Sequence, residues 1–542
     1  MSKAENSSPQ SARRHDLDAL RAVAMLLGIF LHGILSFTPR EFPWFVKDQS
    51  LHELWLMPFS VIHGFRMPLF FLVSGYFTMM LFRKRGVWSL LSHRVKRIFL
   101  PLLLGLVTIV PVCHWVSSQA ITVSSDVFWF GVFTGDVMIL SAQLESGDID
   151  VEQYHPEFGA TPLGIASLYG HLGTMEALIE SGADVNHANR DRNAPIHTVA
   201  FTGNYRAYLI LKEAGVDVDQ TNADGSTARS NCQLDWNVTK AIADALRLPL
   251  KKEQVLAGRK LIVADLDGNA IDASSLSAAG MDGVTSSGKE SVPQWLKRQL
   301  LDGRLFLHLW FLWSLFLLVI VFLVLGGIGK LVRFDPGWFP KWLLMPPISL
   351  LWLIPLAAWS ESYMSPIFGP DTATGLVPNF NLLAYYGIFF FYGAIYFHCR
   401  DEQGRLGWWW FLTVPLSLFL VFPFTVSVLH DPQWKEYRIL AAVLESVYVW
   451  LMVFGSIGFF RLLLSRESKI MRYVSDSSYW LYLAHLPLVI WLQLLVRDWD
   501  LSSPVKALLV IGVATVSLLI SYQIFVRYTP IGWLLNGKRG KA

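Results

Sequence analysis

Two ionisable side chains stand at a helical spacing inside an apolar stretch near the N-terminus. Residues 16–34 read DLDALRAVAMLLGIFLHGI, and Arg21 and His32 are eleven residues apart within this stretch. At about 100° per residue this step closes three helical turns, so both side chains project from one stripe, about 16 Å apart along the axis. An ionisable group inside a bilayer is costly and usually faces a bundle interior or a wet cavity. The pattern predicts a functional polar stripe within a membrane helix.

More polar side chains are expected to join His32 in the outer half of the membrane. The second apolar stretch contains VIHGFRMPLFF, which puts His63 and Arg66 on one helix face. A later stretch, HLWFLWSL, begins with His308. Histidine is suited to general acid–base catalysis near neutral pH, and arginine to stabilising oxyanions or phosphates. The predicted outer site is lined by His32, His63, Arg66 and His308.

A second polar set is expected near the inner face. The stretch YWLYLAHLPLV carries Tyr482 and His485, and counting from the predicted start of its helix puts both at the depth of Arg21 and Asp18. The strongly basic loop 83–97 lies on the same side and suits a phosphorylated ligand. We interpret the two sets as the ends of a path across the membrane.

Each of these residues also has a structural interpretation. Arg21 can snorkel to the headgroups, His32 can make a hydrogen bond between helices, and Arg66 can pair with a backbone carbonyl. The remaining histidines can likewise be structural, and the basic loop can serve only as a topology signal. The residues alone leave these alternatives open.

Composition identifies the class of protein. Hydrophobic residues make up 53% of the 542 residues, mean hydropathy is +0.40, and there are 22 Trp and 36 Phe. These values are typical of a multi-pass membrane protein, and the predicted fold class is an all-α membrane bundle. Ten stretches are long and apolar enough to cross a bilayer: 17–38, 60–82, 98–117, 305–328, 342–359, 380–398, 407–428, 438–463, 479–496 and 505–526.

Charge in the short loops predicts the orientation. Every loop rich in Lys and Arg falls on one side, so both termini are expected in the cytoplasm. The first apolar run is too long for a signal peptide and lacks a small-residue cleavage site, so it is expected to stay in the protein. The three cysteines, Cys113, Cys232 and Cys399, show neither a disulfide framework nor a zinc spacing, and no metal site is predicted.

Residues 118–304 interrupt the membrane pattern with a 33-residue period. ATPL at 160–163 recurs as NAPI at 193–196, and GADVN at 182–186 recurs as GVDVD at 215–219. The period and these motifs resemble ankyrin repeats, in which helix pairs stack side by side.

The repeat segment follows the third span, so the charge rule puts it on the periplasmic side. It is either a docking surface for a protein or ligand or a tolerated spacer. Residues 251–292 are expected to be a mobile linker and 293–304 an interfacial helix. The predicted domains are 1–117 and 305–542 for the membrane part, 118–250 for the ankyrin-like insertion, and 251–304 for the linker and interfacial helix.

The motifs resemble those of the membrane acyltransferase-3 family. RRHDLDALRAVAMLLGIFLHG looks like the opening of that family, whose signature of Arg, ten residues and His falls on Arg21 and His32. FRMPLFFLVSGYF and YWLYLAHLPLV are similar to its second-span and late-span motifs. HLWFLWSL brings the chain nearest to the branch that adds succinyl groups to osmoregulated periplasmic glucans. The resemblance covers about residues 12–117 and 300–530 and leaves out the ankyrin-like segment.

The resemblance implies an O-acyltransferase of the bacterial inner membrane. It would move an acyl group, succinyl or acetyl, from cytosolic acyl-CoA to hydroxyls of an extracytoplasmic glucan or other glycan. No permanently bound cofactor is expected, and the expected partners are acyl-CoA, a glycan, the lipid bilayer and a protein for the repeats, with no nucleic acid.

A sugar hydroxyl is a poor nucleophile, so His32 is the expected general base or transient acyl carrier. Arg66 is expected to stabilise the oxyanion or, like Arg21, to hold the donor. Substrate-binding roles are expected for Asp18, His63, His308, Tyr482 and His485.

Two other function classes stay open at this point. Intramembrane His and Arg also mark ion pathways, so a transporter or channel with an ankyrin-like sensor is an alternative. That class predicts pseudo-symmetric halves, and the sequence shows no such repeat. An ankyrin-like scaffold on a passive anchor leaves ten spans with buried charges unexplained.

Overall fold

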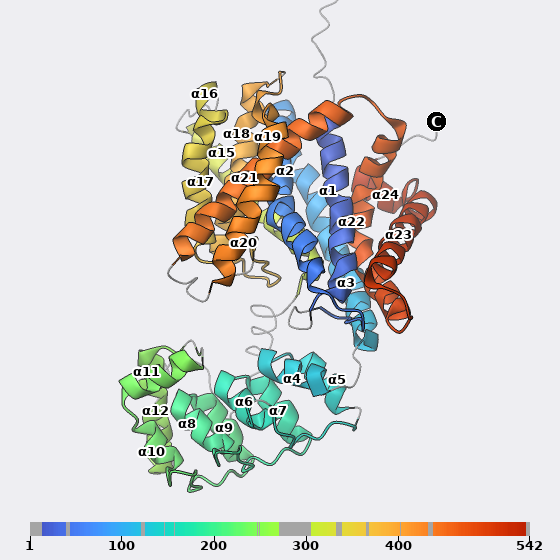
Figure 1. Cartoon of the computed structure of the whole chain (residues 1–542). Coiled ribbons are helices and arrows are strands. Elements are labelled where there is room, and N and C mark those ends of the chain that lie inside the picture. Colours follow the sequence, from blue (N-terminus) through green and yellow to red (C-terminus); the bar gives the residue numbers. More distant parts are fainter. Residues whose placement is uncertain are drawn as a thin grey trace, which may run out of the picture. The chain divides into compact units, whose positions relative to one another are not determined.

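The computed structural model is all-helical in the part of the chain that it describes, which confirms the predicted fold class (Figure 1). The described residues are 14–39, 44–120, 125–145, 147–156, 158–246, 248, 250–269, 305–331, 339–364, 368–401, 403–431 and 437–537. The chain divides into two compact units, Met1–Ser117 with Leu300–Ala542, and Ser118–Gln299. The predicted interfacial helix 293–304 and the end of the predicted linker lie outside the described residues.

The first unit is a bundle of long apolar helices. Its main helices are α1 (His15–Ile34), α2 (Leu56–Arg94), α3 (Leu100–Ala120), α15 (Trp310–Leu331), α18 (Phe380–Tyr396), α19 (Trp410–Leu416), α20 (Phe422–His430), α21 (Arg438–Leu464), α22 (Lys469–Val496) and α23 (Ser503–Ser521). Eight helical segments within the described ranges are long and apolar enough to cross a membrane. One of them, Glu53–Ser117, runs for 65 residues and covers both the second and the third predicted span.

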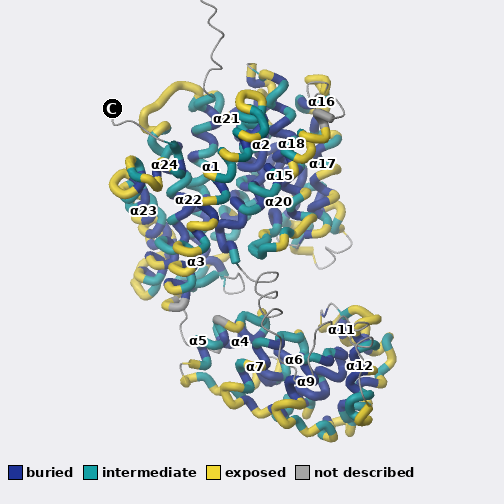
Figure 2. The backbone as a smooth tube through the Cα atoms, turned by 180° about the vertical axis from the view of Figure 1, so that it is seen from behind, coloured by how far each residue is buried: buried dark blue, intermediate teal, exposed yellow. Residues whose placement is uncertain are grey.

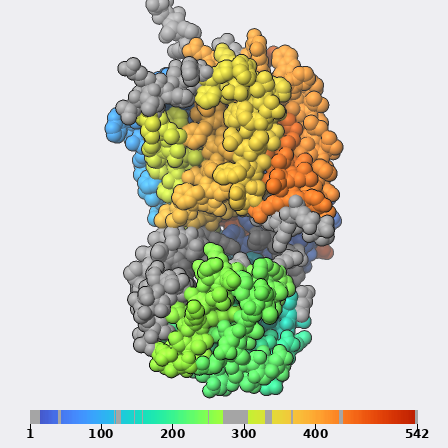
Figure 3. Space-filling view, turned by 90° about the vertical axis from the view of Figure 1, so that its left-hand side faces the viewer, coloured from blue at the N-terminus to red at the C-terminus, as the bar shows by residue number. Residues whose placement is uncertain are grey.

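Burial distinguishes the centre of this bundle from its lipid-facing edge. In α1, 61% of the most apolar window is buried, compared with 22% for Trp410–His430. Figure 2 shows the same contrast along the backbone. Residues 339–431, yellow to orange, lie on the face that Figure 3 shows. Apolar side chains of this segment are exposed, for example Phe419, which is 79% exposed. Because α1 is surrounded by α2, α21, α22 and α23, its polar side chains are held inside the bundle.

Two membrane segments differ from the prediction. The basic stretch 83–97 is not a loop: α2 continues to Arg94, with a break at Gly86, whose φ of 76° favours glycine. A π-helical turn, Val95–Phe99, then leads into α3. Successive basic residues therefore project from helices, where sequence patterning predicted a flexible loop.

The predicted fifth span is a 14-residue helix, α17 (Ile348–Glu361), which falls short of the ~20 residues of a full crossing. A short helix, α16 (Lys341–Leu344), precedes it. The amide of Phe306 donates to the carbonyl of Thr374, at 2.9 Å. The chain therefore leaves this point through α15 and returns to it after α17, and α17 packs on α18 and α21.

The second unit is a row of short helix pairs. They are α4 (Ser125–Thr134) with α5 (Val137–Leu144), α6 (Pro162–Tyr169) with α7 (Leu172–Glu180), α8 (Pro195–Thr202) with α9 (Tyr205–Glu213), and α10 (Ala228–Cys232) with α11 (Trp236–Ala245). Both α6 and α8 begin with proline and end at a left-handed glycine, Gly170 or Gly203, at the 33-residue spacing seen in the sequence. Apolar faces of the pairs share one core. The assignment to the ankyrin family stays a prediction.

The prediction of a mobile linker is wrong for about the first third of residues 251–292. Residues Lys252–Leu266 form α12, which packs on α8, α9 and α10. The Arg259 guanidinium is 2% exposed and donates to the Phe201 and Leu234 carbonyls. Gly258 lets the backbones of α12 and α8 touch, since a Cβ there would lie 1.8 Å from the Gly203 carbonyl oxygen. The polar composition of the segment hid this buried face.

Cys232 is expected to resist thiol reagents in the folded protein. Burial raises the pKa of this thiol to about 11, so little reactive thiolate exists at neutral pH. We predict that a maleimide labels Cys232 only after unfolding, whichever side of the membrane the unit occupies. The exposed Ser181, changed as Ser181→Cys in a cysteine-free background, is the matched reporter of sidedness. Rapid labelling of native Cys232 would contradict this account.

Candidate active site

The ring of His32 on α1 meets the ring of His485 on α22. Their Nδ1 and Nε2 atoms are 2.8 Å apart, and the two rings are coplanar to within 4°. His32 is seventeen residues from the start of α1, and His485 is sixteen from the start of α22. At about 1.5 Å per residue, both rings therefore lie about 25 Å along neighbouring helices.

The predicted position of His485 and Tyr482 beside Arg21 is wrong. The sequence interpretation started this helix at residue 479, whereas α22 starts at Lys469. The polar run before residue 479 is helical and inside the bundle, with Ser475 and Ser478 each 3% exposed. A polar run that looked like a loop therefore hid ten residues of helix and moved His485 to the level of His32.

Hydrogen bonds assign the protons on these two rings. Nδ1 of His485 lies 2.8 Å from the Tyr482 carbonyl oxygen and 3.1 Å from that of Leu481, and both are acceptors only. Nδ1 of His485 therefore carries a proton, and in the neutral ring its Nε2 accepts from Nδ1–H of His32. This leaves Nε2 of His32 with a free lone pair, the form that a general base requires.

Two more histidines face the same space with a lone pair. Nε2 of His308 donates to the Leu483 carbonyl at 3.0 Å, and its buried Nδ1 has no hydrogen-bond partner in the described part of the chain. Nε2 of His63 donates to the Pro370 carbonyl at 3.0 Å, which leaves its Nδ1 as an acceptor. The Tyr482 hydroxyl donates to the His308 carbonyl at 2.7 Å and fixes the backbone there.

Arg66 brings a positive charge to these rings. Its guanidinium lies against Gly28 on α1, where a Cβ would be 2.4 Å from an Arg66 Nη1 atom. Gly28 is on the stripe between Arg21 and His32, so the glycine makes room for the arginine there. Within the described residues, Nε of Arg66 is buried and has no hydrogen-bond partner. A buried guanidinium that shares a cavity with three imidazole rings suits an anionic or polarised oxygen.

These side chains surround one cavity of about 330 Å³. Six of the eight predicted site residues line it, and Arg21 and Asp18 do not. The lining residues are Met25, Gly28, Leu31, His32, Leu35, Trp44, Phe59, His63, Arg66, Met67, His308, Trp310, Phe311, Gly369, Pro370, Asp371, Thr372, Tyr482 and His485. The volume is at the lower end of ligand pockets and fits a sugar ring or an acyl group.

Sequence reasoning missed the parts that hold His32 in place. The ring of Trp44 lies over that of His32, with centroids 5.6 Å apart. Trp44 donates to the side chain of Gln493, whose amide in turn donates to the His32 and Gly33 carbonyls. The loop that carries Trp44 is fastened by a buried ion pair, Asp48 with Lys506, at 2.9 Å. Trp44 and Gln493 lie 449 residues apart in sequence, and no local pattern joins them.

The loop 369–372 forms the opposite wall and was also missed. Its Pro370 carbonyl accepts from His63, and its Gly369 amide donates to Glu445 on α21 at 3.0 Å. Asp371 adds a carboxylate to the cavity lining. Two carboxylates inside apolar stretches, Glu361 and Glu445, were the signal in the sequence for a polar site in this region. The sequence analysis considered the buried Arg and His residues and did not use these carboxylates.

Arg21 belongs to a separate cluster near the N-terminal end of α1. It donates to the Ser475 hydroxyl at 3.3 Å and lies 3.7 Å from the Asp18 carboxylate. Arg94 is near enough for its charge to interact with that of Arg21. Arg94 donates to Thr78, while its buried Nε has no hydrogen-bond partner among the described residues. The two arginines form a cationic site about 16 Å from His32, by the helical rise of α1.

Gln493→Leu tests the support of His32. The change removes the hydrogen bonds of the Gln493 side chain with the Trp44 indole N–H and with the His32 and Gly33 carbonyls, so we expect the free energy of unfolding to fall by about 1–3 kcal/mol. Thermal unfolding of the purified protein in detergent measures it. Gln523→Leu, at an exposed position, is the control. Equal melting temperatures for the two variants would show that this network does not stabilise the bundle.

Comparison with known proteins agrees with this geometry. The chain matches the acyltransferase-3 family, described as an acyltransferase domain, over residues 14–178 and 276–525. It is 41% identical over 92 residues to glucans biosynthesis protein C of Escherichia coli strain SMS-3-5, covering 17% of this chain and 23% of that protein. It is 39% identical over 98 residues to the protein of that name from Salmonella paratyphi B, covering 18% and 25%.

These pairwise matches cover about a quarter of the length of the curated relatives. The family match is much longer and includes both halves of the helical bundle. It also extends into the helix pairs of the second unit, as far as residue 178. The chain therefore belongs to the acyltransferase-3 family of multi-pass membrane proteins and is related to glucans biosynthesis protein C.

Proposed function

We propose that the protein moves an acyl group, succinyl or acetyl, from cytosolic acyl-CoA to a hydroxyl of a glucan or other glycan outside the membrane. The observation that supports this most is the His32 Nε2 lone pair, held in one cavity with the Arg66 guanidinium, whose buried Nε has no hydrogen-bond partner in the described part of the chain. The names of the curated relatives favour a glucan as acceptor. The bacterial inner membrane, cytoplasmic termini and an outside acceptor are part of the same proposal.

The cavity provides the groups that ester formation needs. An acceptor hydroxyl donates its proton to Nε2 of His32 as its oxygen attacks the thioester carbonyl. The carbonyl oxygen becomes an oxyanion, which the charge of Arg66 stabilises. When the C–S bond breaks, the proton on His32 passes to the leaving thiolate. Acyl oxygen ester and free thiol are the products, so atoms and charge balance.

His32 can alternatively carry the acyl group itself. Its Nε2 would then attack the thioester carbonyl, and the C–S bond would break to release the donor thiolate. In a second step the acceptor hydroxyl would attack the acyl-imidazole, its proton would pass through a base to the thiolate, and Nε2 of His32 would regain its lone pair. His63 or His308, each with a lone pair on Nδ1, is the base available for that second step. Rapid quenching with donor but without acceptor separates the two routes, because only the second route accumulates acylated His32.

The cationic cluster of Arg21 and Arg94 is the proposed site for the donor phosphates. Both are guanidinium groups, which suit phosphate oxygens, and Ser475 adds a hydroxyl. About 16 Å separates Arg21 from His32 along α1, a distance that an extended thioester arm attached to those phosphates must span. Asp18 is proposed to orient Arg21 at the same site.

The transporter or channel alternative has less support. The intramembrane charges that suggested it lie in a cavity and a cationic cluster, and the proposed acyl transfer gives each of them a role; the family match favours this class. A transporter would move its substrate unchanged, whereas the proposed enzyme forms a new ester. Analysis of the product separates the two classes directly.

His32→Ala is expected to lower kcat by about 10²–10⁴-fold, because the variant lacks the proposed base or acyl carrier. Ester formation on a glucan acceptor, followed by mass spectrometry with purified protein in vesicles, measures the rate. His430→Ala, at an exposed position of α20, is the matched control and should leave the rate unchanged. Near-normal acylation by a correctly inserted His32→Ala protein would overturn the mechanism.

Arg94→Ala is expected to raise KM for acyl-CoA about tenfold or more with little change in kcat, because it removes a charged contact to the donor and leaves the cavity intact. Initial rates at varied donor concentration give both constants. Arg85→Ala, exposed on the same basic segment, is the control. An Arg94→Ala protein with unchanged donor KM would remove this arginine from the donor site.

A further inference from the structure

A cluster of aromatic rings lies on the surface of the second unit, far in sequence from the cavity. Phe133, at the end of α4, contacts the rings of His155, Phe158 and Tyr169, with centroids 5.3, 5.9 and 6.1 Å away. His155 and Phe158 stack at 4.7 Å, and Tyr169 stacks on His171 at 5.8 Å. We call these five residues the aromatic patch. It joins three successive elements: α4, the loop before α6, and the α6–α7 turn.

The exposure of this patch is unusual for rings of this size. Phe158 is 63% exposed and Tyr169 is 41% exposed, although neighbouring rings hold both. Scattered apolar side chains on a surface need no explanation, but a contiguous group commonly marks a binding site. Contacts between the rings order these side chains before a ligand binds, so binding would cost little side-chain entropy.

Backbone contacts hold the patch rigid. His171 donates to the Phe133 carbonyl at 3.0 Å, which joins the turn before α7 to the end of α4. Gly135, with φ of 69°, leaves room for the His171 ring, since a Cβ there would lie 2.6 Å from its Nδ1. The His155 amide donates to the Ala160 carbonyl and closes the loop that carries Phe158.

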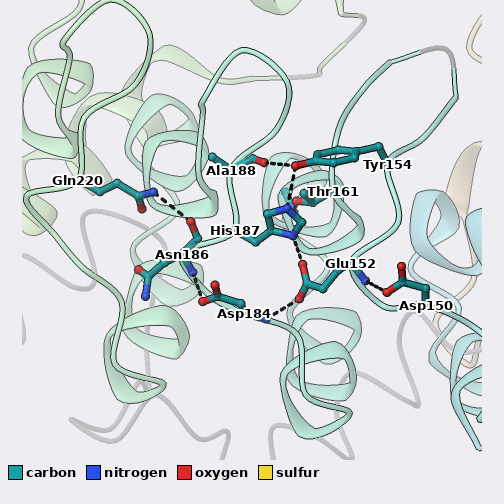
Figure 4. Close-up of polar contacts among 10 residues, drawn as sticks. Asp150, Glu152, Tyr154, Thr161, Asp184, Asn186, His187, Ala188 and Gln220 are labelled. Atoms are coloured by element: carbon teal, nitrogen blue, oxygen red, sulfur yellow. Dashed lines mark hydrogen bonds and ion pairs between the residues drawn. The ribbon is translucent and has the colours of Figure 1, made fainter.

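Hydrogen-bonding side chains border the patch on the loop side. The Arg190 side chain packs against Gly159, which follows Phe158 in the chain. Its guanidinium lies over the face of the Tyr154 ring. The Tyr154 hydroxyl lies 2.7 Å from Nε2 of His187, whose Nδ1 contacts Glu152, as Figure 4 shows. The surface therefore offers flat apolar faces beside fixed donors and acceptors.

We propose that the aromatic patch binds the glucan acceptor by stacking its sugar rings on Phe158 and Tyr169. A glucose ring has an apolar C–H face that fits an aromatic ring and a rim of hydroxyls that fits groups such as Arg190 and Tyr154. Aromatic side chains also occur at protein interfaces and at membrane surfaces, so the ring types alone do not select the occupant; we select the glucan because the named relatives are glucans biosynthesis proteins. This inference rests on the proposed function, since it places the second unit on the side of the acceptor.

The patch gives a long acceptor a second point of attachment. A chain of linked sugars held there stays near the enzyme between acylation events, so its local concentration at the cavity rises. A single sugar ring that occupies the cavity cannot also occupy the patch. The patch should therefore affect the use of long glucans and leave the use of short acceptors unchanged.

Binding of a fluorescently labelled linear glucose oligosaccharide to the full-length protein in detergent tests the proposal. No donor is present, so the measurement needs no turnover. Phe158→Ala and Tyr169→Ala should each weaken binding about tenfold, the loss expected from one stacked ring. Phe158→Trp should retain binding. Val238→Ala, at another exposed apolar position of the same unit, should have no effect.

The outcomes separate this proposal from the proposed function. Unchanged affinity in Phe158→Ala and Tyr169→Ala would overturn the patch, even if the protein acylates glucans. A melting temperature that falls in vesicles but not in detergent, with glucan affinity unchanged, would assign the patch to the bilayer and also overturn it. Patch-dependent binding by a protein that forms no ester would support the patch and refute the transferase.

Discussion

The in-plane hydrogen bond between His32 and His485 is the contact on which the rest of the site depends. Burial of an imidazole ring inside an apolar bundle costs free energy unless its nitrogen atoms are hydrogen-bonded. Here two carbonyls of α22 accept a hydrogen bond from Nδ1–H of His485, and Nε2 of His485 accepts from Nδ1–H of His32. This leaves a lone pair on Nε2 of His32, whose ring lines the cavity. The direction of this chain of hydrogen bonds follows from backbone acceptors that cannot change role. A helical backbone thus sets the protonation of the proposed catalytic ring.

Packing around this contact explains several otherwise unrelated features of the bundle. The Gln493 side chain donates to the His32 and Gly33 carbonyls and accepts from the Trp44 indole N–H. The Trp44 ring stacks on the His32 ring. The buried pair of Asp48 and Lys506 holds the Trp44 loop. Gly28 has no side chain, which leaves room for the Arg66 guanidinium beside α1, and both residues line the cavity. Each feature restricts the geometry of one cavity, and none of them would be needed in a passive membrane anchor.

The sequence predicted many residues of this site but missed the contacts that position them. The helical period put Arg21 and His32 on one stripe. Counting residues from the ends of the predicted spans brought His63, Arg66 and His308 to a similar depth as His32. Both arguments need only the sequence within a single helix. His485 was placed wrongly because buried serines made ten residues of α22 look like a loop. Trp44, Gln493 and Asp371 were missed because their contacts join distant segments. The buried face of α12 was missed because Gly258 and Arg259 look polar or flexible until they meet α8. The roles of the predicted residues in binding and catalysis are still proposals.

We propose that a donor from one side of the membrane and an acceptor from the other side react at one cavity. The most direct measurement places isotopically labelled acyl-CoA inside sealed vesicles that contain oriented protein, and unlabelled glucan outside. Mass spectrometry then follows the label. The account predicts labelled ester on the external glucan while the vesicles stay impermeable to the donor. Ester that forms only when donor and glucan share one compartment would contradict it.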